Sequence, residues 1–405
     1  MRNVEGRWLF FIFWGLTIFG IITISSVSVY ESHQLEIKNN GRQIFCQRYP
    51  KKCQNSFFNF SASQQREIKN LGTEFCSNLE NNCNTFYLRR HLLHIILGFF
   101  VFMFGVVFPI EFLRKLALPI FLFSLALLGI LFISGIGNEA GSARSWIHIP
   151  FLPSIQPSEI AKMALIFYFA VWMEKKEVEV RTWHSGFVPF VLILLPVVFF
   201  LAKQPDFGSL MVIASIAGSM FFVAGGNILH IFIGSIISAA ISLPVIFSHQ
   251  YILDRFSAFL NPENSDAGYQ ILQSLIAVGS GKFFGVGIGN SGQRYGWLPE
   301  IQGDTIFAAA AEELGFFRII FLVGIFFIIA ILGFRVAKKS RSRFEMLVSV
   351  GITTWIVLQA FINIGVTIAI LPLTGITLPF ISYGGSSLLS LLFAVGILLQ
   401  ISKKN

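Results

Sequence analysis

Residues 307–334 read FAAAAEELGFFRIIFLVGIFFIIAILGF, and this stretch decides the fold class. From Ile319 to its end the stretch carries no charged side chain, and a hydrocarbon core about 30 Å thick needs about 20 apolar residues in a helix. The whole chain repeats this pattern, because 54% of its 405 residues are hydrophobic and only 13% are charged, against about 25% charged in soluble domains. The composition excludes an ordinary soluble enzyme and predicts a polytopic membrane protein.

Charges and clusters of Gly, Pro and Asn divide the chain into ten apolar runs of suitable length. These runs are approximately residues 8–30, 91–110, 116–135, 156–173, 187–202, 208–225, 228–248, 307–334, 345–369 and 381–401. We therefore predict an all-α polytopic membrane protein with about ten transmembrane helices in a single membrane domain, residues 1–405. Two long polar connections remain, residues 31–88 after the first span and residues 249–306 between spans 7 and 8.

An even number of spans places both termini on one side, but basic residues alone do not choose the side. With the termini inside, Lys and Arg number 14 inside and 14 outside, because residues 31–90 hold nine of them. The cysteines decide the orientation. All four lie in the first connection, and disulfides persist in oxidising compartments, so this connection is expected outside. They are Cys46, Cys53, Cys76 and Cys83, in two C-x6-C pairs. We predict an N-in/C-in topology with two extracytoplasmic disulfides whose pairing stays open; zinc is a weaker alternative, because its ligand pairs are usually closer together.

The net charge of +9 does not indicate a nucleic-acid partner, because basic residues of membrane proteins usually lie in cytoplasmic loops. Gly287–Gly292 satisfies G-x-G-x-x-G, but no βαβ unit surrounds it, so a nucleotide site is a poor interpretation. We expect the connection 249–306, which has six glycines between Gly279 and Gly292, to face the loop of Arg144 and Trp146. It can bring backbone amides, guanidinium groups and carboxylates to one polar pocket at the membrane surface.

Ionisable residues inside predicted spans are costly and therefore mark functional or paired structural positions. Glu159 and Lys162 are three apart and share one helix face, which suits an ion pair as well as a substrate contact. Lys203 and Asp206 flank a short outside turn, which as a simple hairpin would explain both charges. Glu312 and Glu313 lie at the expected start of the eighth span. Gln359 and Asn363 are four apart in the ninth span, a spacing that suits interhelical hydrogen bonds. Lys282 and Arg294 are further basic candidates in the connection 249–306.

Several longer strings resemble the SEDS family of membrane peptidoglycan glycosyltransferases, whose branches are FtsW and RodA. The strings are Ala143–Ile147, Gln156–Glu159 with Lys162, Gln204–Gly208, Tyr269–Gln270, Gln273–Ala277, Gly279–Gly281, Leu298–Glu300 with Asp304, Glu312–Gly315 and Leu378–Ser387. They follow the family's order over about three quarters of the chain. Gly287–Ser291 and Gly375–Pro379 look more like the division branch, FtsW, whereas Arg144–Ile147 looks like some RodA sequences.

The resemblance implies an enzyme of the bacterial cytoplasmic membrane that polymerises lipid II into glycan strands at the outer face, with undecaprenyl diphosphate leaving. It assigns the general base to Asp304 and implies substrate binding by a set of residues at the same surface. That set is Arg144, Trp146, Glu159, Lys162, Lys203, Asp206, Lys282, Arg294, Glu300, Ser382 and Ser386. Positive charge for the diphosphate would come from these cations or from a divalent cation. A class B penicillin-binding transpeptidase and other divisome or elongasome membrane proteins are the implied partners.

The sequence departs from the family in two places. The family's His-Thr-Asp-Phe is replaced by Gln302, Gly303, Asp304 and Thr305, which keeps the acid and changes its neighbours. The 31–88 insertion is longer than the family's first loop. Three alternatives stay open: a flippase or transporter for a lipid-linked precursor, the elongation polymerase of the RodA type, and a scaffold without chemistry, against which the retained Asp304 argues.

Overall fold

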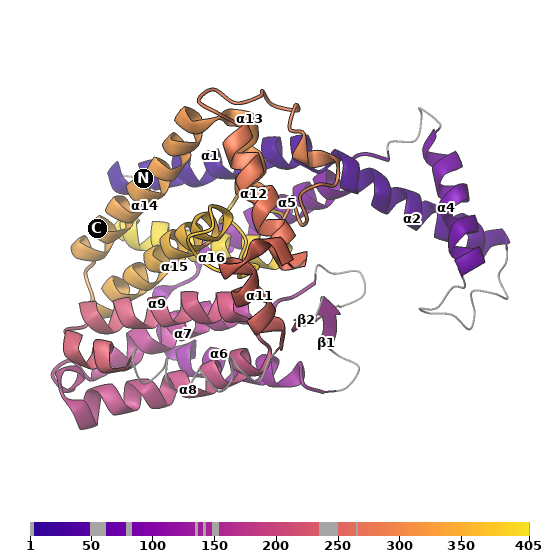
Figure 1. Cartoon of the computed structure of the whole chain (residues 1–405). Helices are drawn as coiled ribbons and strands as arrows, with labels where there is room; N and C mark the ends of the chain where they lie inside the picture. The colour runs from indigo at the N-terminus through magenta and orange to yellow at the C-terminus, as the bar shows by residue number, and fades with distance from the viewer. Residues whose placement is uncertain are drawn as a thin grey trace.

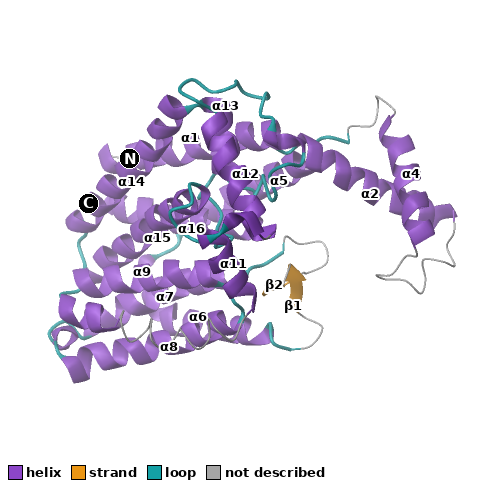
Figure 2. Ribbon diagram, in the orientation of Figure 1, coloured by secondary structure: helices purple, strands orange, loops and turns teal. Residues whose placement is uncertain are grey.

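The computed structural model describes residues 4–48, 62–77, 83–133, 137–140, 143–147, 154–234, 250–264 and 266–404. Most of them are helical, as the composition predicts (Figure 2). The helices of the first half are α1 (Val4–Val27), α2 (Val29–Arg48), α4 (Ala62–Ser77), α5 (Phe86–Val107), α6 (Ile110–Ile130), α7 (Pro157–Lys175), α8 (Val188–Lys203) and α9 (Phe207–Val223). Those of the second half are α11 (Gln250–Leu260), α12 (Asp266–Ser280), α13 (Ile306–Leu314), α14 (Phe316–Lys339), α15 (Arg343–Thr367) and α16 (Gly385–Lys404).

Seven helices within the described residues are long and apolar enough to cross a membrane. They are α1, α5, α6, α14, α15, α16 and the helix Trp183–Lys203, whose first five residues form a π-helical turn before α8. Helix α9 is apolar but shorter, and α7 carries four charged residues. The seventh predicted span, 228–248, lies mostly outside the described residues, so the count of ten stays a prediction.

Helix α15 lies at the centre of the bundle. It contacts α7, α9, α14 and α16, and 21 of its residues are buried. Helices α5, α6 and α14 instead expose large apolar side chains, among them Phe100, Phe123 and Phe321. The protein is therefore arranged with a packed interior and an apolar outer face, which is the pattern a lipid bilayer requires of its helices.

The two chain termini lie at the same end of the bundle (Figure 1). Ion pairs join helix ends there: Lys339 at the end of α14 with Glu5 at the start of α1, and Lys404 at the end of α16 with Glu345 at the start of α15, at 3.7 Å. Arg114 near the start of α6 pairs with Glu174 near the end of α7 at 2.8 Å. These contacts make one charged end, as expected if both termini face the same compartment.

The opposite end of the bundle carries the β-hairpin and a helical arm, α2 and α4 (Figure 1). The connection 31–88 is thus largely helical in its described part. Gly41 and Gly72 allow the two helices to touch, because a Cβ at either position would lie 1.9 Å from a carbonyl oxygen of the other helix. Cys76 and Cys83 form a disulfide, and Cys46 is also disulfide-bonded; Cys53 lies outside the described residues.

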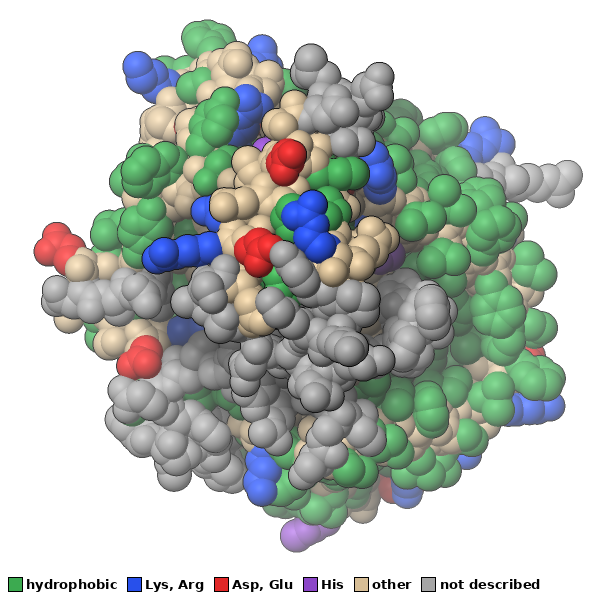
Figure 3. Space-filling view, turned by 90° about the vertical axis from the view of Figure 1, so that its right-hand side faces the viewer, with side chains coloured by type: hydrophobic (Ala, Val, Ile, Leu, Met, Phe, Trp, Pro, Cys, Tyr) green, Lys and Arg blue, Asp and Glu red, His purple; other side chains and the backbone are tan. Residues whose placement is uncertain are grey.

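Viewed onto this end, charged side chains lie toward the middle and hydrophobic side chains cover the right flank (Figure 3). The hairpin, β1 (Gly137–Ala140) and β2 (Ala143–Ile147), is an antiparallel exception to the all-α prediction. The connection 249–306 is also more ordered than a loop, since its described part contains α11, α12 and two 3-10 turns, Pro262–Asn264 and Gln293–Tyr295.

The prediction of one span over 307–334 was wrong, because the chain breaks at Gly315 into α13 and α14. Gly315 has φ +78, and a Cβ there would lie 2.1 Å from the Gly285 nitrogen. The close approach of residues 282–285 therefore stops the helix, and the Phe316 N–H donates to the Lys282 carbonyl. Glu312 and Glu313 consequently lie at the end of α13 rather than at the start of a span. The last span also begins later than predicted, at Gly385.

Candidate functional site

A polar cavity of about 180 Å³ lies where the starts of α7 and α9 meet α11, the hairpin and the segment before α16. Its lining residues are Ser145, Trp146, Gln156, Glu159, Lys162, Pro205, Asp206, Ser209, Arg255, Thr374, Gly375, Ile376 and Thr377. Four of the residues predicted to bind substrate, Trp146, Glu159, Lys162 and Asp206, are thus brought together from three parts of the sequence.

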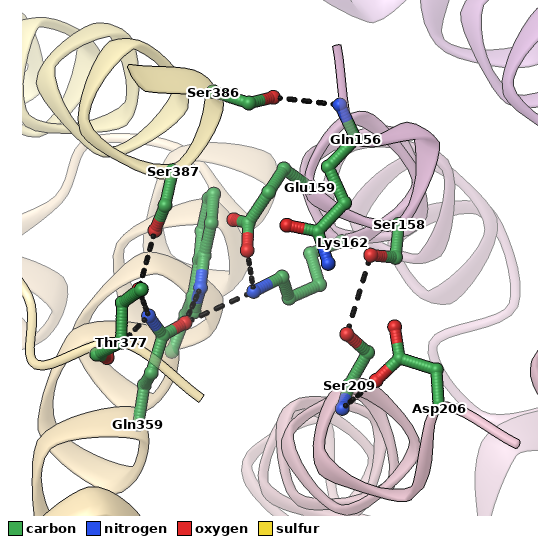
Figure 4. Close-up of polar contacts among 11 residues, drawn as sticks. Gln156, Ser158, Glu159, Lys162, Asp206, Ser209, Gln359, Thr377, Ser386 and Ser387 are labelled. Atoms are coloured by element: carbon green, nitrogen blue, oxygen red, sulfur yellow. Dashed lines mark hydrogen bonds and ion pairs between the residues drawn. The ribbon is translucent and has the colours of Figure 1, made fainter. Parts of the chain in front are cut away.

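Helix α7 contributes an ion pair to the cavity wall. Pro157 occupies the first turn, where its missing N–H costs nothing, and places Glu159 and Lys162 on one face. The Lys162 ammonium donates to the Glu159 carboxylate at 2.8 Å and to the Gln359 side-chain oxygen at 2.9 Å (Figure 4). It also lies 5.0 Å from the centre of the Trp355 ring. With 1% exposure, Lys162 is a buried cation held by one anion and two neutral groups.

Helix α9 supplies the facing wall. Its N-cap is Asp206, whose Oδ1 accepts from the Ser209 N–H at 3.0 Å, a geometry that stabilises the first turn. The Ser209 hydroxyl donates to the Ser158 hydroxyl at 3.2 Å and so joins α9 to α7 (Figure 4). The Gln156 N–H donates to Ser386 Oγ at 3.0 Å, which places Ser386 one contact behind the cavity wall.

Asp304 lies beside this cavity. The Asn363 side-chain amide donates to the carbonyls of Asp304 and Ile376, both at 2.7 Å, and Ile376 lines the cavity. Arg255, another lining residue, donates to the Leu373 carbonyl at 3.1 Å and interacts electrostatically with Asp304. Asn363 therefore anchors two loops instead of making the predicted interhelical hydrogen bond, whereas Gln359 does make one, with Lys162 of α7.

The environment of Asp304 makes its carboxyl group a stronger base than usual. Burial raises the pKa of Asp304 to about 6, and the negative charge of Glu300 acts in the same direction. Arg255 and a hydrogen bond from Gln270, 3.4 Å long, act in the opposite direction. A carboxylate that is ionised near neutral pH and has a raised proton affinity suits general base catalysis.

Several predicted binding residues do not line the cavity. Lys203 is exposed, and its ammonium nitrogen lies 5.3 Å from the centre of the Phe199 ring. Lys282 borders a separate, largely apolar groove formed by α12, α13 and α14. Arg294 donates to the Tyr295 hydroxyl at 2.8 Å. Ser382 Oγ accepts from the Leu378 N–H and stabilises a turn. Arg144 lies in β2, where Glu139 is its partner in the strand register, and Glu300 acts on Asp304 through its charge.

The connection 249–306 meets the cavity only in part: Arg255 lines the cavity and Asp304 lies beside it, whereas the amides of the Gly-rich loop, Gly287–Gly292, bind elsewhere. The Glu312 carboxylate accepts from Ser291 Oγ and from the Gly292 N–H, and Glu313 accepts from Ser26 Oγ and from the Gly289 N–H. These two acids therefore use the amides that could otherwise bind an anion, and they fix the loop against α13 and α1. This role also explains two adjacent acids, which helix capping alone does not.

Sequence reasoning gave no site role to Arg255, Gln270 or the Thr374–Thr377 segment, although Gly375–Thr377 belongs to the family-like string Gly375–Pro379. Gln270 stands in one of the family-like strings, Tyr269–Gln270, and that string was the available signal. Arg255 is one of several charged residues in a long polar connection. Only the packing of α11 against the segment before α16 distinguishes it from the others.

These features define a multi-pass membrane protein with an acidic and basic site at the end opposite its termini. A family model described as "Cell cycle protein", which covers FtsW, RodA and SpoVE, matches residues 73–405. The chain belongs to the FtsW/RodA/SpoVE family, and it is a multi-pass protein of the bacterial cytoplasmic membrane.

The chain is 37% identical over 319 residues to the probable peptidoglycan glycosyltransferase FtsW of Trichlorobacter lovleyi, an alignment of 78% of this chain and 84% of that protein. It is 39% identical over 279 residues to stage V sporulation protein E of Bacillus subtilis, covering 68% and 76%.

Solved structures confirm the fold. A chain from a structure titled "Structural coordination of polymerization and crosslinking by a peptidoglycan synthase complex" matches with a TM-score of 0.72 and 22% identity, covering 100% of this chain and 98% of that chain. The rod shape determining protein RodA of Thermus thermophilus matches with a TM-score of 0.64, 21% identity and the same coverage.

Proposed function

We propose that this protein is a peptidoglycan glycosyltransferase that polymerises lipid II during cell division, at the outer face of the cytoplasmic membrane. The observation that carries the proposal is the position of Asp304, a partly buried carboxylate with a raised pKa beside a cavity that holds Lys162 and Arg255. The names of the FtsW relatives support the activity and the division role.

In the proposed reaction, Asp304 removes the proton from the 4-hydroxyl of the acceptor N-acetylglucosamine. The oxygen attacks C1 of the donor N-acetylmuramic acid, the bond from C1 to the diphosphate oxygen breaks, and undecaprenyl diphosphate leaves with its electron pair. Lys162 and Arg255 lie at the cavity wall, where positive charge stabilises the departing diphosphate. Trp146 offers an aromatic surface for the sugar or the lipid.

The residues of this cavity do not form a good metal site by themselves. Glu159 Oε2 and Asp206 Oδ2 are buried and have no hydrogen-bond partner, but Lys162 lies between the two side chains (Figure 4). Within the described ranges no group of three or more His, Cys, Asp or Glu side chains could hold a metal ion. The proposed mechanism therefore takes no step through a divalent cation.

A class B penicillin-binding transpeptidase is the proposed partner. One solved structure that shares the fold is described as a complex that coordinates polymerisation with crosslinking. A polymerase that releases uncrosslinked glycan at the outer face needs such a partner to join its strands, and the assay below includes it.

The substitution Asp304→Asn tests the assignment. It keeps the shape of the side chain but removes the base, so we expect polymerisation to fall by roughly 100-fold or more while folding is nearly unchanged. Purified protein with its transpeptidase partner would be incubated with labelled lipid II, and the glycan polymer would be separated on a gel.

Melting temperature and co-purification of the partner serve as controls. If Asp304 only stabilised the start of α13, the Asn variant would keep its activity, because Asn also caps helices well. Near wild-type polymerisation by this variant would remove Asp304 from the mechanism. Transport of labelled lipid II without polymer would favour the flippase alternative.

A further inference from the structure

The side chain of Gln302, two residues before Asp304, is 4% exposed and anchors the loop from inside the protein. Its amide nitrogen donates to the Tyr87 hydroxyl of α5 at 3.1 Å. Its backbone carbonyl accepts from the Tyr383 N–H at 2.8 Å. A hydrogen bond also joins the Gln302 side chain to Glu31 of α2. One residue thus connects the Asp304 loop to three other parts of the chain.

Tyr87, the main partner of Gln302, is itself held firmly. Its ring packs edge to face against the Tyr383 ring, with 4.9 Å between the ring centres. Its backbone N–H donates to Ser32 Oγ at 3.4 Å, and Ser32 is fully buried in α2. Tyr87 therefore has little freedom to follow Gln302, which makes it a fixed reference point for the loop.

The segment between this anchor and the acid needs such a reference. Gly303 separates Gln302 from Asp304, and glycine has the widest choice of backbone conformations. The Gly303 N–H donates to the Glu300 carbonyl at 2.8 Å and closes a turn, while Asn363 holds the Asp304 carbonyl. The contact from Gln270 to the carboxylate is long, at 3.4 Å. The direction of the carboxylate is therefore set largely by the two ends of a flexible turn.

We propose that Gln302 is a positioning residue for glycosyl transfer, and that its hydrogen bond to Tyr87 fixes the loop so that the Asp304 carboxylate faces the acceptor hydroxyl. This inference rests on the proposed function of Asp304. It gives a role to Gln302, one of the neighbours of Asp304 at which this sequence departs from the family's His-Thr-Asp-Phe. It also connects the extracytoplasmic arm to the site, since Glu31 and Ser32 belong to α2.

The test compares Gln302→Leu, Tyr87→Phe and their double variant. Tyr168→Phe, which removes a hydroxyl from a ring stacked on Phe121, is the control. Because a displacement of about 1 Å at a reacting group costs up to about 100-fold in rate, we expect each single variant to lower kcat by roughly 10-fold with little change in KM. The double variant should be no slower than Gln302→Leu, since that substitution already removes the hydrogen bond to Tyr87.

Two further measurements separate positioning from simple stabilisation. Gln302→His, which keeps a donor within reach of Tyr87, should recover most of kcat. The acid limb of the kcat profile against pH should move in Gln302→Leu, because the carboxylate shifts relative to Glu300 in its own loop, Arg255 of α11 and Gln270 of α12. The titratable groups around position 302 itself, Glu31, Tyr87 and Tyr383, are the same in the wild type and in Gln302→Leu.

The outcomes are distinguishable from a failure of the proposed function. If Asp304→Asn is inactive while Gln302→Leu and Tyr87→Phe keep wild-type kcat per folded molecule, only the positioning role is overturned. Additive losses in the double variant, or a lowered melting temperature with unchanged kcat and pH profile, also overturn it. If Asp304→Asn stays active, the proposed function fails first.

Discussion

At the scale of single residues, the charges around Asp304 set the pH at which the site works. Arg255 stabilises the ionised carboxylate and Glu300 opposes it, while burial raises the pKa above its ordinary value of 3.8 to about 6. Because the base must be ionised, polymerisation should be low when pH is below this pKa and should rise through it. The raised pKa therefore moves the midpoint of activity upward, toward neutral pH.

Two substitutions should move that midpoint in opposite directions. Removing the positive charge in Arg255→Gln raises the pKa of Asp304 and shifts the acid limb to higher pH; Glu300→Gln lowers the pKa and shifts it to lower pH. Polymerisation rates from about pH 4.5 to 8 would measure both. Lys338→Gln, an exposed cation at the other end of the bundle, is the matched control. A shift of both variants in the same direction would contradict this electrostatic account.

The buried pair Glu159 and Lys162 leads to a prediction about stability. Lys162→Met leaves an unpaired carboxylate, and Glu159→Gln leaves a buried ammonium with neutral partners only. Each should destabilise the protein by about 3 kcal/mol, because a lone buried charge loses solvation without compensation. The double variant should be more stable than either single one. A double-mutant cycle on melting temperature measures the coupling, and simple additivity would indicate separate roles.

At the scale of helices, the arm of α2 and α4 depends on contact between two glycines. In Gly41→Ala the new Cβ would lie 1.9 Å from the Ile68 carbonyl oxygen, so the helices must separate. We expect the arm to become sensitive to proteolysis while the bundle stays folded. Gly15→Ala in α1 is the control, because a Cβ there meets no atom within 4 Å. An arm as resistant as that of the wild type would show that the contact is dispensable.

The disulfide of Cys76 and Cys83 gives a second prediction for the same element. In intact cells a maleimide reagent should label these cysteines only after reduction, because the bonded sulfurs do not react. Peptide mapping after labelling would identify them. Free labelling without reductant would contradict the bond.

At the scale of the whole molecule, the ion-paired end with both termini and the end with the arm should face opposite sides of the membrane. Arg341 lies between α14 and α15 at the first end, and Trp297 lies between α12 and α13 at the second; both are exposed. A membrane-impermeant thiol reagent should label Trp297→Cys in intact cells and Arg341→Cys only after permeabilisation. The reverse pattern would overturn the N-in/C-in assignment.

The sequence by itself determined the membrane class and the acid on which the proposed chemistry depends. Apolar runs of about 20 residues have one compact solution in a bilayer, the helix, because every backbone polar group must find an internal partner. The pairing of Glu159 with Lys162 was also predictable, since residues three apart share a helix face. Asp304 stood out because the family's acid is kept after the string Leu298–Glu300, although the neighbours of Asp304 differ.

Tertiary structure alone decided which polar residues form the site. Arg255 acts on Asp304 through its charge because α11 packs near the segment before α16, and no local pattern encodes the proximity of such distant segments. The Gly-rich loop had the composition of an anion site, but Glu312 and Glu313 occupy its amides, and the close approach of Gly285 breaks a run that reads as one span. Hydropathy reports how much a residue prefers lipid; it does not report which backbone approaches it in space.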